Sequence, residues 1–232
     1  MEYINRIRST SIWIFIVPVL SLNLCLFISV NYHLLENTIF VVDQIGRSGF
    51  TIPYIDGGIS ISRSARTYPT YLLFKPAMLL TSFFLIRYWI LNNKLFQKIN
   101  SNLNNNYFLF FGVASAFFLI LHSALLGVEF EIDIYKFFRR FILLAFIIFE
   151  IAAQILLVIS IIKSKSNLQN LFNKKILILK IILVTILVVV AIFSLPILNS
   201  SEFTHFKHAL EWNYFLGVVS FYLLTFLFWK SN

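Results

Sequence analysis

The sequence predicts an all-α membrane protein: one bundle of six transmembrane helices with both termini in the cytoplasm. Hydrophobic residues make up 59% of the chain and charged residues only 12%, whereas soluble domains carry about 25% charged residues. The mean hydropathy is +0.84. The apolar residues fall in blocks of roughly 20, the length that crosses about 30 Å of hydrocarbon as a helix.

The apolar blocks and their short connections use up the chain, so we expect a single domain over residues 1–232. Arg6 and Arg8 precede the first block, as in a signal peptide. That block is too long and lacks a small-residue cleavage site, so we expect an uncleaved first span. The longest connection is the loop 33–69. The expected spans are about 11–32, 70–91, 107–127, 138–162, 176–198 and 207–229.

Charged residues in the connections sort by side of the membrane, which predicts the orientation. The termini and the second and fourth connections carry nine bases against the single acid Glu2. These bases are Arg6, Arg8, Lys94, Lys98, Lys163, Lys165, Lys174, Lys175 and Lys230. Eight of the ten acids lie on the other side, namely Glu36, Asp43, Asp56, Glu129, Glu131, Asp133, Glu202 and Glu211. Because basic connections stay in the cytoplasm, the loop 33–69 is expected to face outward.

Several function classes have no support in the sequence. The net charge is +9, but the chain has no polar domain on which these charges could form a basic surface. We therefore expect no nucleic-acid partner. Phosphate loops, dinucleotide fingerprints and the GxSxG serine motif are absent, so we expect no cofactor. Cys25 is the single cysteine, which rules out an intrachain disulfide.

The stretch 52–76, IPYIDGGISISRSARTYPTYLLFKP, is the main polar segment outside the spans. Asp56 precedes Gly57 and Gly58, a pair typical of a turn that gathers backbone N–H groups. Arg63 and Arg66 offer forked donors for phosphate oxygens, so we predict a lipid-headgroup site here. The alternative is a plain connector in which Asp56 caps a turn and the arginines contact surface lipid.

A second polar group lies at the start of the last expected span. His208 and Glu211 are three residues apart and share a helix face, and His122 lies near the same end of the third span. Converging histidines and carboxylates could bind zinc and activate water. The sequence contains no HExxH motif, and interfacial His and Glu commonly satisfy helix ends, so we predict no metal site. The candidate catalytic residues are Asp56, His122, His208 and Glu211.

Two further sets of polar residues lie inside the spans. Glu150 and Gln154 are one turn apart in the fourth span, where a carboxyl must face the bundle and have a partner or be protonated. Asn23 or His122 would be a structural partner for Glu150, whereas a proton-coupled transporter would use the carboxyl. Basic side chains near span ends are expected to reach the interface as anchors: Lys75, Arg87 and Lys180.

The stretch 52–76 resembles the signature of the Frag/DRAM/Sfk family of six-span membrane proteins. Pro53, Tyr54, Ile55, Asp56 and Gly58 match the family's Pro-Tyr-Ile-Ser-Asp-x-Gly run once its Ser is skipped, and Pro69, Phe74 and Lys75 suit the part that follows. In the last span, Glu211 and Trp212 resemble the family's acid–aromatic pair. The resemblance implies membrane-lipid handling. Relatives remodel the lipid of glycosylphosphatidylinositol anchors, modulate autophagy or organise membrane phospholipids.

Three function hypotheses follow. The first is a lipid-binding or lipid-organising protein that recognises a headgroup through Tyr54, Asp56, Gly58, Arg63, Arg66, Glu211 and Trp212. The second is a lipid acyltransferase or hydrolase, and the third is a small proton-coupled transporter. The expected partners are membrane lipids, and the sequence names no protein partner. Richness in Ile, Asn, Lys and Phe is typical of an AT-rich genome; in a bacterium the chain would lie in the inner (plasma) membrane.

Overall fold

A computed structural model describes residues 2–40, 46–99, 107–128, 133–168, 171–199 and 202–230. Among them, six helices are long and apolar enough to cross a membrane, so the chain is an integral, multi-pass membrane protein. These are α1 (Glu2–Val30), α3 (Thr70–Ile99), α4 (Tyr107–Leu125), α5 (Asp133–Lys163), α7 (Lys174–Asn199) and α8 (Thr204–Phe228). The short helices are η1 (Tyr32–Leu35), α2 (Ile61–Arg66) and α6 (Lys165–Leu168). No strand occurs in the described ranges, which confirms the all-α prediction.

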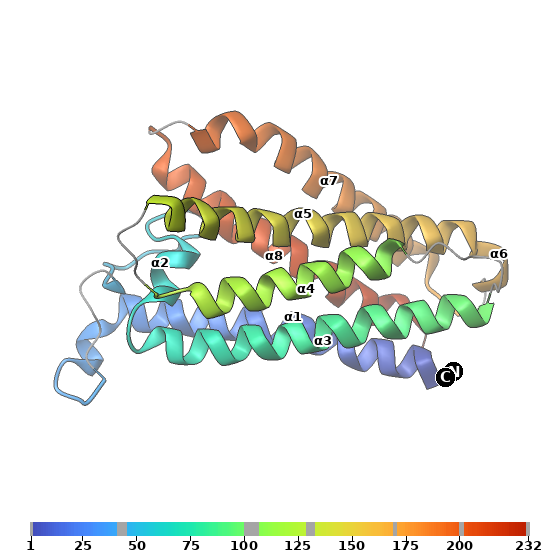
Figure 1. The fold of residues 1–232 in the computed structure, drawn as a ribbon, viewed down its shortest axis with the longest axis horizontal. Coiled ribbons are helices and arrows are strands. Elements are labelled where there is room, and N and C mark those ends of the chain that lie inside the picture. The colour runs from blue at the N-terminus through green and yellow to red at the C-terminus, as the bar shows by residue number, and fades with distance from the viewer. Residues whose placement is uncertain are drawn as a thin grey trace.

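The long helices pack in chain order and close into a ring. Each packs against the next, from α1 to α3, α4, α5, α7 and α8, and α8 returns to α1. Both termini lie at one end of the bundle, while η1 and α2 lie at the other (Figure 1). The end that holds the termini is closed by backbone hydrogen bonds, from Asn173 N–H to Phe228 O at 2.9 Å and from Lys230 N–H to Leu171 O at 3.0 Å.

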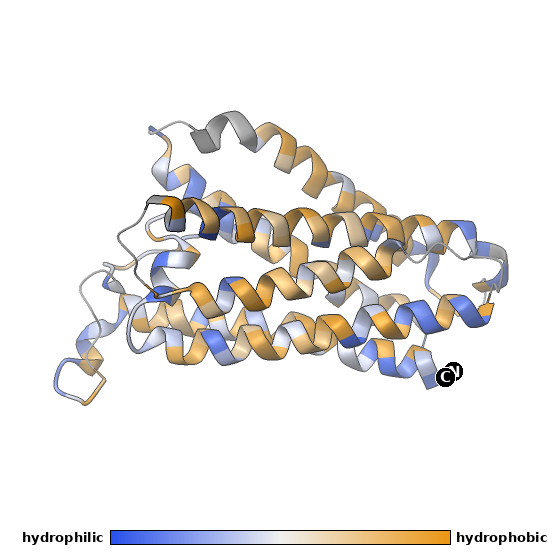
Figure 2. Cartoon of the chain, viewed as in Figure 1, coloured by the Kyte–Doolittle hydropathy of each residue, from blue (hydrophilic) through white to orange (hydrophobic). Residues whose placement is uncertain are grey.

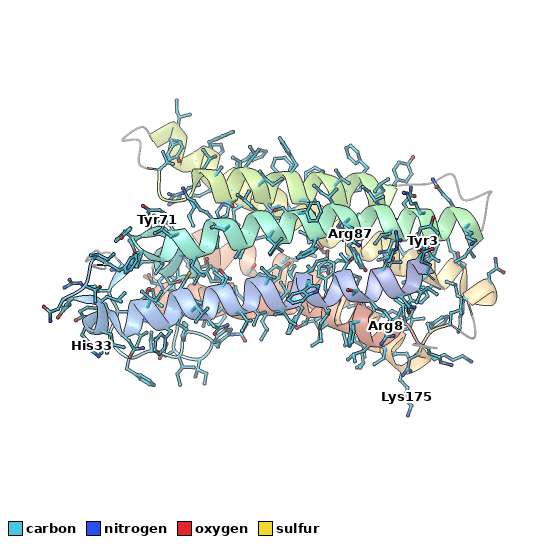
Figure 3. All side chains as sticks on the ribbon, turned by 90° about the horizontal axis from the view of Figure 1, so that it is seen from below. Tyr3, Arg8, His33, Tyr71, Arg87 and Lys175 are labelled. Carbon is cyan, nitrogen blue, oxygen red and sulfur yellow. The ribbon has the colours of Figure 1, made fainter. Side chains whose placement is uncertain are left out.

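Apolar residues predominate in the middle of the bundle, and polar residues gather toward its ends (Figure 2). The face of α7 is typical of a lipid-facing helix, since Phe193 is 74% exposed and Ile192 60% exposed. Contact between such an exposed apolar helix face and water is unfavourable, so this face of α7 is expected to lie against lipid. Arg8 and Lys175 lie at the end with the termini, and His33 and Tyr71 at the opposite end (Figure 3).

Two glycines set close helix contacts. A Cβ at Gly112 would overlap the ring of Trp89, and a Cβ at Gly217 would press on Leu187. Small residues let membrane helices approach closely, where packing replaces the hydrophobic driving force. Gly112 therefore seats Trp89 between α3 and α4, and Gly217 brings α8 against α7.

The helix α3 is longer than the expected span 70–91. It continues to Ile99, through Asn92 and Asn93, which were expected to lie in a loop. Asn92 is 1% exposed and its amide donates to the backbone oxygen of Tyr88 at 2.9 Å. The helix continues because this residue satisfies its side chain within the helix and packs against neighbours, despite its low hydropathy.

Candidate functional site: a cap docked on the last helix

Residues 51–66 fold onto the end of the bundle, and we call this segment the cap. Asp56 organises its first half. One carboxylate oxygen accepts hydrogen bonds from Thr51 Oγ1 at 2.5 Å and Gly58 N–H at 2.9 Å, and the other accepts from Ile52 N–H at 2.9 Å. These bonds, led by that from Thr51, hold the pKa of Asp56 below its ordinary value. The carboxylate therefore serves the turn itself, as in the connector interpretation.

Gly57 brings the cap against the start of α8. Its φ of +63° is the left-handed conformation that favours glycine. A Cβ here would overlap the backbone oxygen of His205. The Gly57 oxygen accepts a hydrogen bond from His208 Nδ1 at 3.0 Å. No residue with a side chain fits this position without moving the cap.

Three further contacts dock the cap on α8. Trp212 is fully buried, and its indole N–H donates to the Ile59 oxygen at 2.9 Å. The amide of Asn213 donates to the Tyr54 oxygen at 2.7 Å. The Glu211 carboxylate accepts from the backbone N–H groups of residues 61 and 62, at the start of α2. The structure thus joins the stretch 52–76 to the start of the last span.

The ring of Tyr54 ties the cap to two helices at once. It lies edge-on to the ring of Trp212, with centroids 5.1 Å apart. Its hydroxyl donates to Asn23 Oδ1 of α1 at 3.2 Å. Burial raises the pKa of Tyr54, although the bond to Asn23 opposes the shift. The phenol therefore stays neutral and acts as a donor.

The two arginines of the predicted headgroup site lie on α2. Ser60 caps this helix by accepting from Arg63 N–H at 3.2 Å. The side chain of Arg63 is exposed, and that of Arg66 is half-buried. The backbone oxygen of Arg66 lies beside Gly127, which follows α4 and has a φ of +80°. The helix α2 therefore spans the gap between α8 and the end of α4.

His122 lies on α4 and not on α8, which makes the contacts that dock the cap. It lies in the last turn of α4, is 8% exposed, and has Arg139 of α5 as its charged neighbour. In the described ranges, no group of three or more His, Cys, Asp or Glu side chains is arranged to hold a metal ion. The structure thus brings together His208, Glu211 and the turn of Asp56, and the hydrogen bonds described above for this group do not involve His122.

Sequence reasoning missed Asn213, Thr51 and the docking role of Asn23. Asn213 and Thr51 donate to oxygens of the cap, and the amide oxygen of Asn23 accepts from the hydroxyl of Tyr54. A signal was present for the asparagines, since an amide inside an apolar span must find a partner. Thr51 has no such signal, because hydroxyl residues are common in loops.

A second polar site lies inside the bundle. The Glu150 carboxyl contacts Ser115, Gln154 and Tyr222, so the suggested partners Asn23 and His122 were wrong. Lys180 was expected to be an interfacial anchor, but it is fully buried. It faces α8, and its side-chain nitrogen Nζ lies 2.6 Å from Thr225 Oγ1. A basic residue two turns into a span reaches the interface only if it faces lipid, and Lys180 does not.

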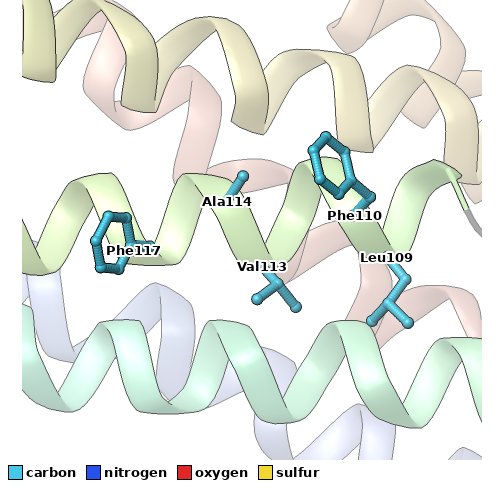
Figure 4. A pocket seen from close by; sticks show the side chains of 5 residues that line it. All are labelled: Leu109, Phe110, Val113, Ala114 and Phe117. Carbon is cyan, nitrogen blue, oxygen red and sulfur yellow. The ribbon is translucent and has the colours of Figure 1, made fainter.

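A shallow apolar groove runs along α4 (Figure 4). It is lined by Leu109, Phe110, Val113, Ala114 and Phe117. The lining offers no polar group to orient a ligand, which is how a lipid-facing helix surface looks. Comparison of the chain with protein-family models, with curated proteins and with solved structures finds no match.

Proposed function

We propose that this membrane protein binds and organises lipids, as the resemblance to the Frag/DRAM/Sfk family implies, and that the cap faces outward and recognises headgroups. The observation that carries the proposal is the surface of the cap and the residue before it. Phe50 is 87% exposed and Ile55 is 80% exposed, and Arg63 of the cap is also exposed. Apolar side chains with a nearby base are typical of segments that lie in the headgroup region.

The hydrogen bonds of the cap support recognition over catalysis. An acyltransferase or hydrolase needs acid–base groups that reach one reacting centre. Here Asp56, His208 and Glu211 are each bonded to backbone groups that hold the cap in place. A rigid, pre-folded cap loses little conformational entropy when it binds a headgroup.

A transporter has less support from the geometry. Such a function needs a continuous polar cavity that reaches Glu150. That carboxyl is 1% exposed and is enclosed by side chains of α4, α5 and α8.

The test is retention of anionic phospholipid by the purified protein, measured by native mass spectrometry after graded delipidation. Arg63→Gln should weaken retention about tenfold or more, because a hydrogen bond to a charged group contributes about 1.5 kcal/mol or more. The matched control is Lys175→Gln, an exposed base at the opposite end of the bundle, which should retain the lipid as the wild type does. Equal retention by all three proteins would reject the proposal. Lipid analysis of a deletion strain separates the enzyme hypothesis, which requires chemically altered lipids.

A further inference from the structure

The bundle core contains a carboxyl and an amine that the proposed lipid function does not use. Glu150 of α5 is 1% exposed and Lys180 of α7 is fully buried. An uncompensated charge at the centre of a membrane helix costs about 3 kcal/mol or more. Among the described residues, the other titratable groups in contact with this core are Tyr88 of α3 and Tyr222 of α8.

The hydrogen bonds around Glu150 fit a protonated carboxyl as well as an ionised one, and the direction of the Ser115 hydroxyl distinguishes the two states. One oxygen, Oε1, accepts from the amide of Gln154 at 3.0 Å and from the hydroxyl of Tyr222. The other, Oε2, lies 2.6 Å from Ser115 Oγ, which also lies 2.8 Å from the backbone oxygen of Gly112. A serine hydroxyl has one hydrogen and donates it once. When it donates to Gly112, the contact with Oε2 needs a proton from the carboxyl.

Lys180 lies at the other end of the same polar region. Its Nζ donates to Thr225 Oγ1 at 2.6 Å and lies 3.8 Å from the ring centroid of Phe221. Thr225 also contacts the hydroxyl of Tyr88 at 3.2 Å. The rings of Tyr88 and Tyr222 meet edge-on with centroids 5.0 Å apart. Two tyrosines and a threonine therefore stand between the amine and the carboxyl.

We propose that Glu150 is a proton-binding site in the bundle core and that Lys180 balances its charge when the proton leaves. In the first state, Glu150 is a neutral acid and Lys180 a neutral amine. In the second, the O–H bond of Glu150 has broken, an N–H bond has formed on Lys180, and the Ser115 hydroxyl has rotated from Gly112 to Oε2. Both states have the same net charge, so neither leaves an unbalanced charge in the hydrocarbon.

Infrared difference spectroscopy of the protein in nanodiscs tests the proton on Glu150. The wild type should show the C=O stretch of a buried protonated carboxylic acid at neutral pH, and Glu150→Gln should lose that band. Glutamine keeps the shape and donates to Ser115 as the protonated acid does, so this variant should fold. If wild type and Glu150→Gln have the same spectrum in this region, Glu150 is ionised and the proposal is wrong.

The role of Lys180 is tested at neutral pH, because the two states exchange no proton with the solvent and their ratio does not depend on pH. Lys180→Met should show a larger protonated-carboxyl band than the wild type, because without the amine an ionised Glu150 has no balancing charge and the neutral acid is favoured. The control is Lys175→Met, which replaces an exposed lysine of the same helix. This variant should show the same protonated-carboxyl band as the wild type. If Lys180→Met fails to fold, Thr225→Val is used instead, because it removes the hydrogen-bond acceptor of Lys180. This variant should change the band in the same direction as Lys180→Met. An unchanged band in the folded variants would show that Lys180 does not balance Glu150. Neither measurement depends on lipid binding.

Discussion

Replacing Gly57 with alanine should release the cap from α8. Gly57 has a φ of +63°, and a Cβ there would overlap the backbone oxygen of His205. That oxygen belongs to the α8 backbone and cannot move aside as a flexible side chain would. The cap must therefore move away, and it loses its hydrogen bonds from His208, Trp212 and Asn213.

The size of the effect follows from these contacts. The left-handed conformation costs an L-residue about 1–2 kcal/mol. Each of the three lost hydrogen bonds contributes about 1 kcal/mol. The sum is about 4–5 kcal/mol, and each 1.4 kcal/mol corresponds to about tenfold in an equilibrium constant. We expect opening of the cap to increase at least about a hundredfold.

Hydrogen–deuterium exchange in nanodiscs measures the opening. The backbone amides of residues 61 and 62 donate to the Glu211 carboxylate of α8, so a peptide over 59–66 reports on the separation of the cap from α8. The matched control is Gly49→Ala, since a Cβ at Gly49 would meet no atom within 4 Å and this glycine has no positive φ. If Gly57→Ala exchanges no faster than Gly49→Ala, close approach to α8 does not hold the cap.

Two more predictions concern the turn and the core. The lowered pKa of Asp56 means that its contribution to cap stability is complete above the ordinary Asp value of about 3.9 and is lost as pH falls through the lower, folded value. In ¹⁵N-glycine-labelled protein, the Gly58 amide should therefore titrate below about 3.9; a midpoint at or above that value contradicts the assignment. Gly112→Val should destabilise the bundle by about 1–3 kcal/mol by overpacking against Trp89, seen as a lower Tm in detergent. Ala114→Val, in the apolar groove on α4, is the control, and equal Tm values would contradict close packing at Gly112.

The six spans could be predicted because the rule is one of length and polarity. A block of about 20 apolar residues has few alternatives to a transmembrane helix. The same rule misplaced the end of α3, since Asn92 and Asn93 lower the local hydropathy as a loop does. A hydropathy profile does not account for the hydrogen bond from the Asn92 side chain to the backbone of its own helix. It therefore predicts the end of a helix with polar residues too early.

The candidate site was partly predictable for a different reason. The sequence predicted that the stretch 52–76 and the pair Glu211 and Trp212 lie at the same end of the bundle. Four expected spans separate them, and an even number of crossings returns the chain to the same side. The partners within that end are mostly backbone groups, such as the oxygens of Ile59, Gly57 and Tyr54. Backbone groups are the same at every position, so no residue pattern identifies them.

The helix α8 links the two polar regions, and its sequence explains how. Trp212 donates a hydrogen bond to the cap, and Tyr222 donates one to Glu150 in the core. The two residues are ten positions apart, which corresponds to about 15 Å along a helix. The cap contacts come from the first turns of α8, whereas the Glu150 contacts also involve α4 and α5. Opening of the cap therefore leaves the hydrogen bonds from Ser115 and Gln154 to Glu150 in place.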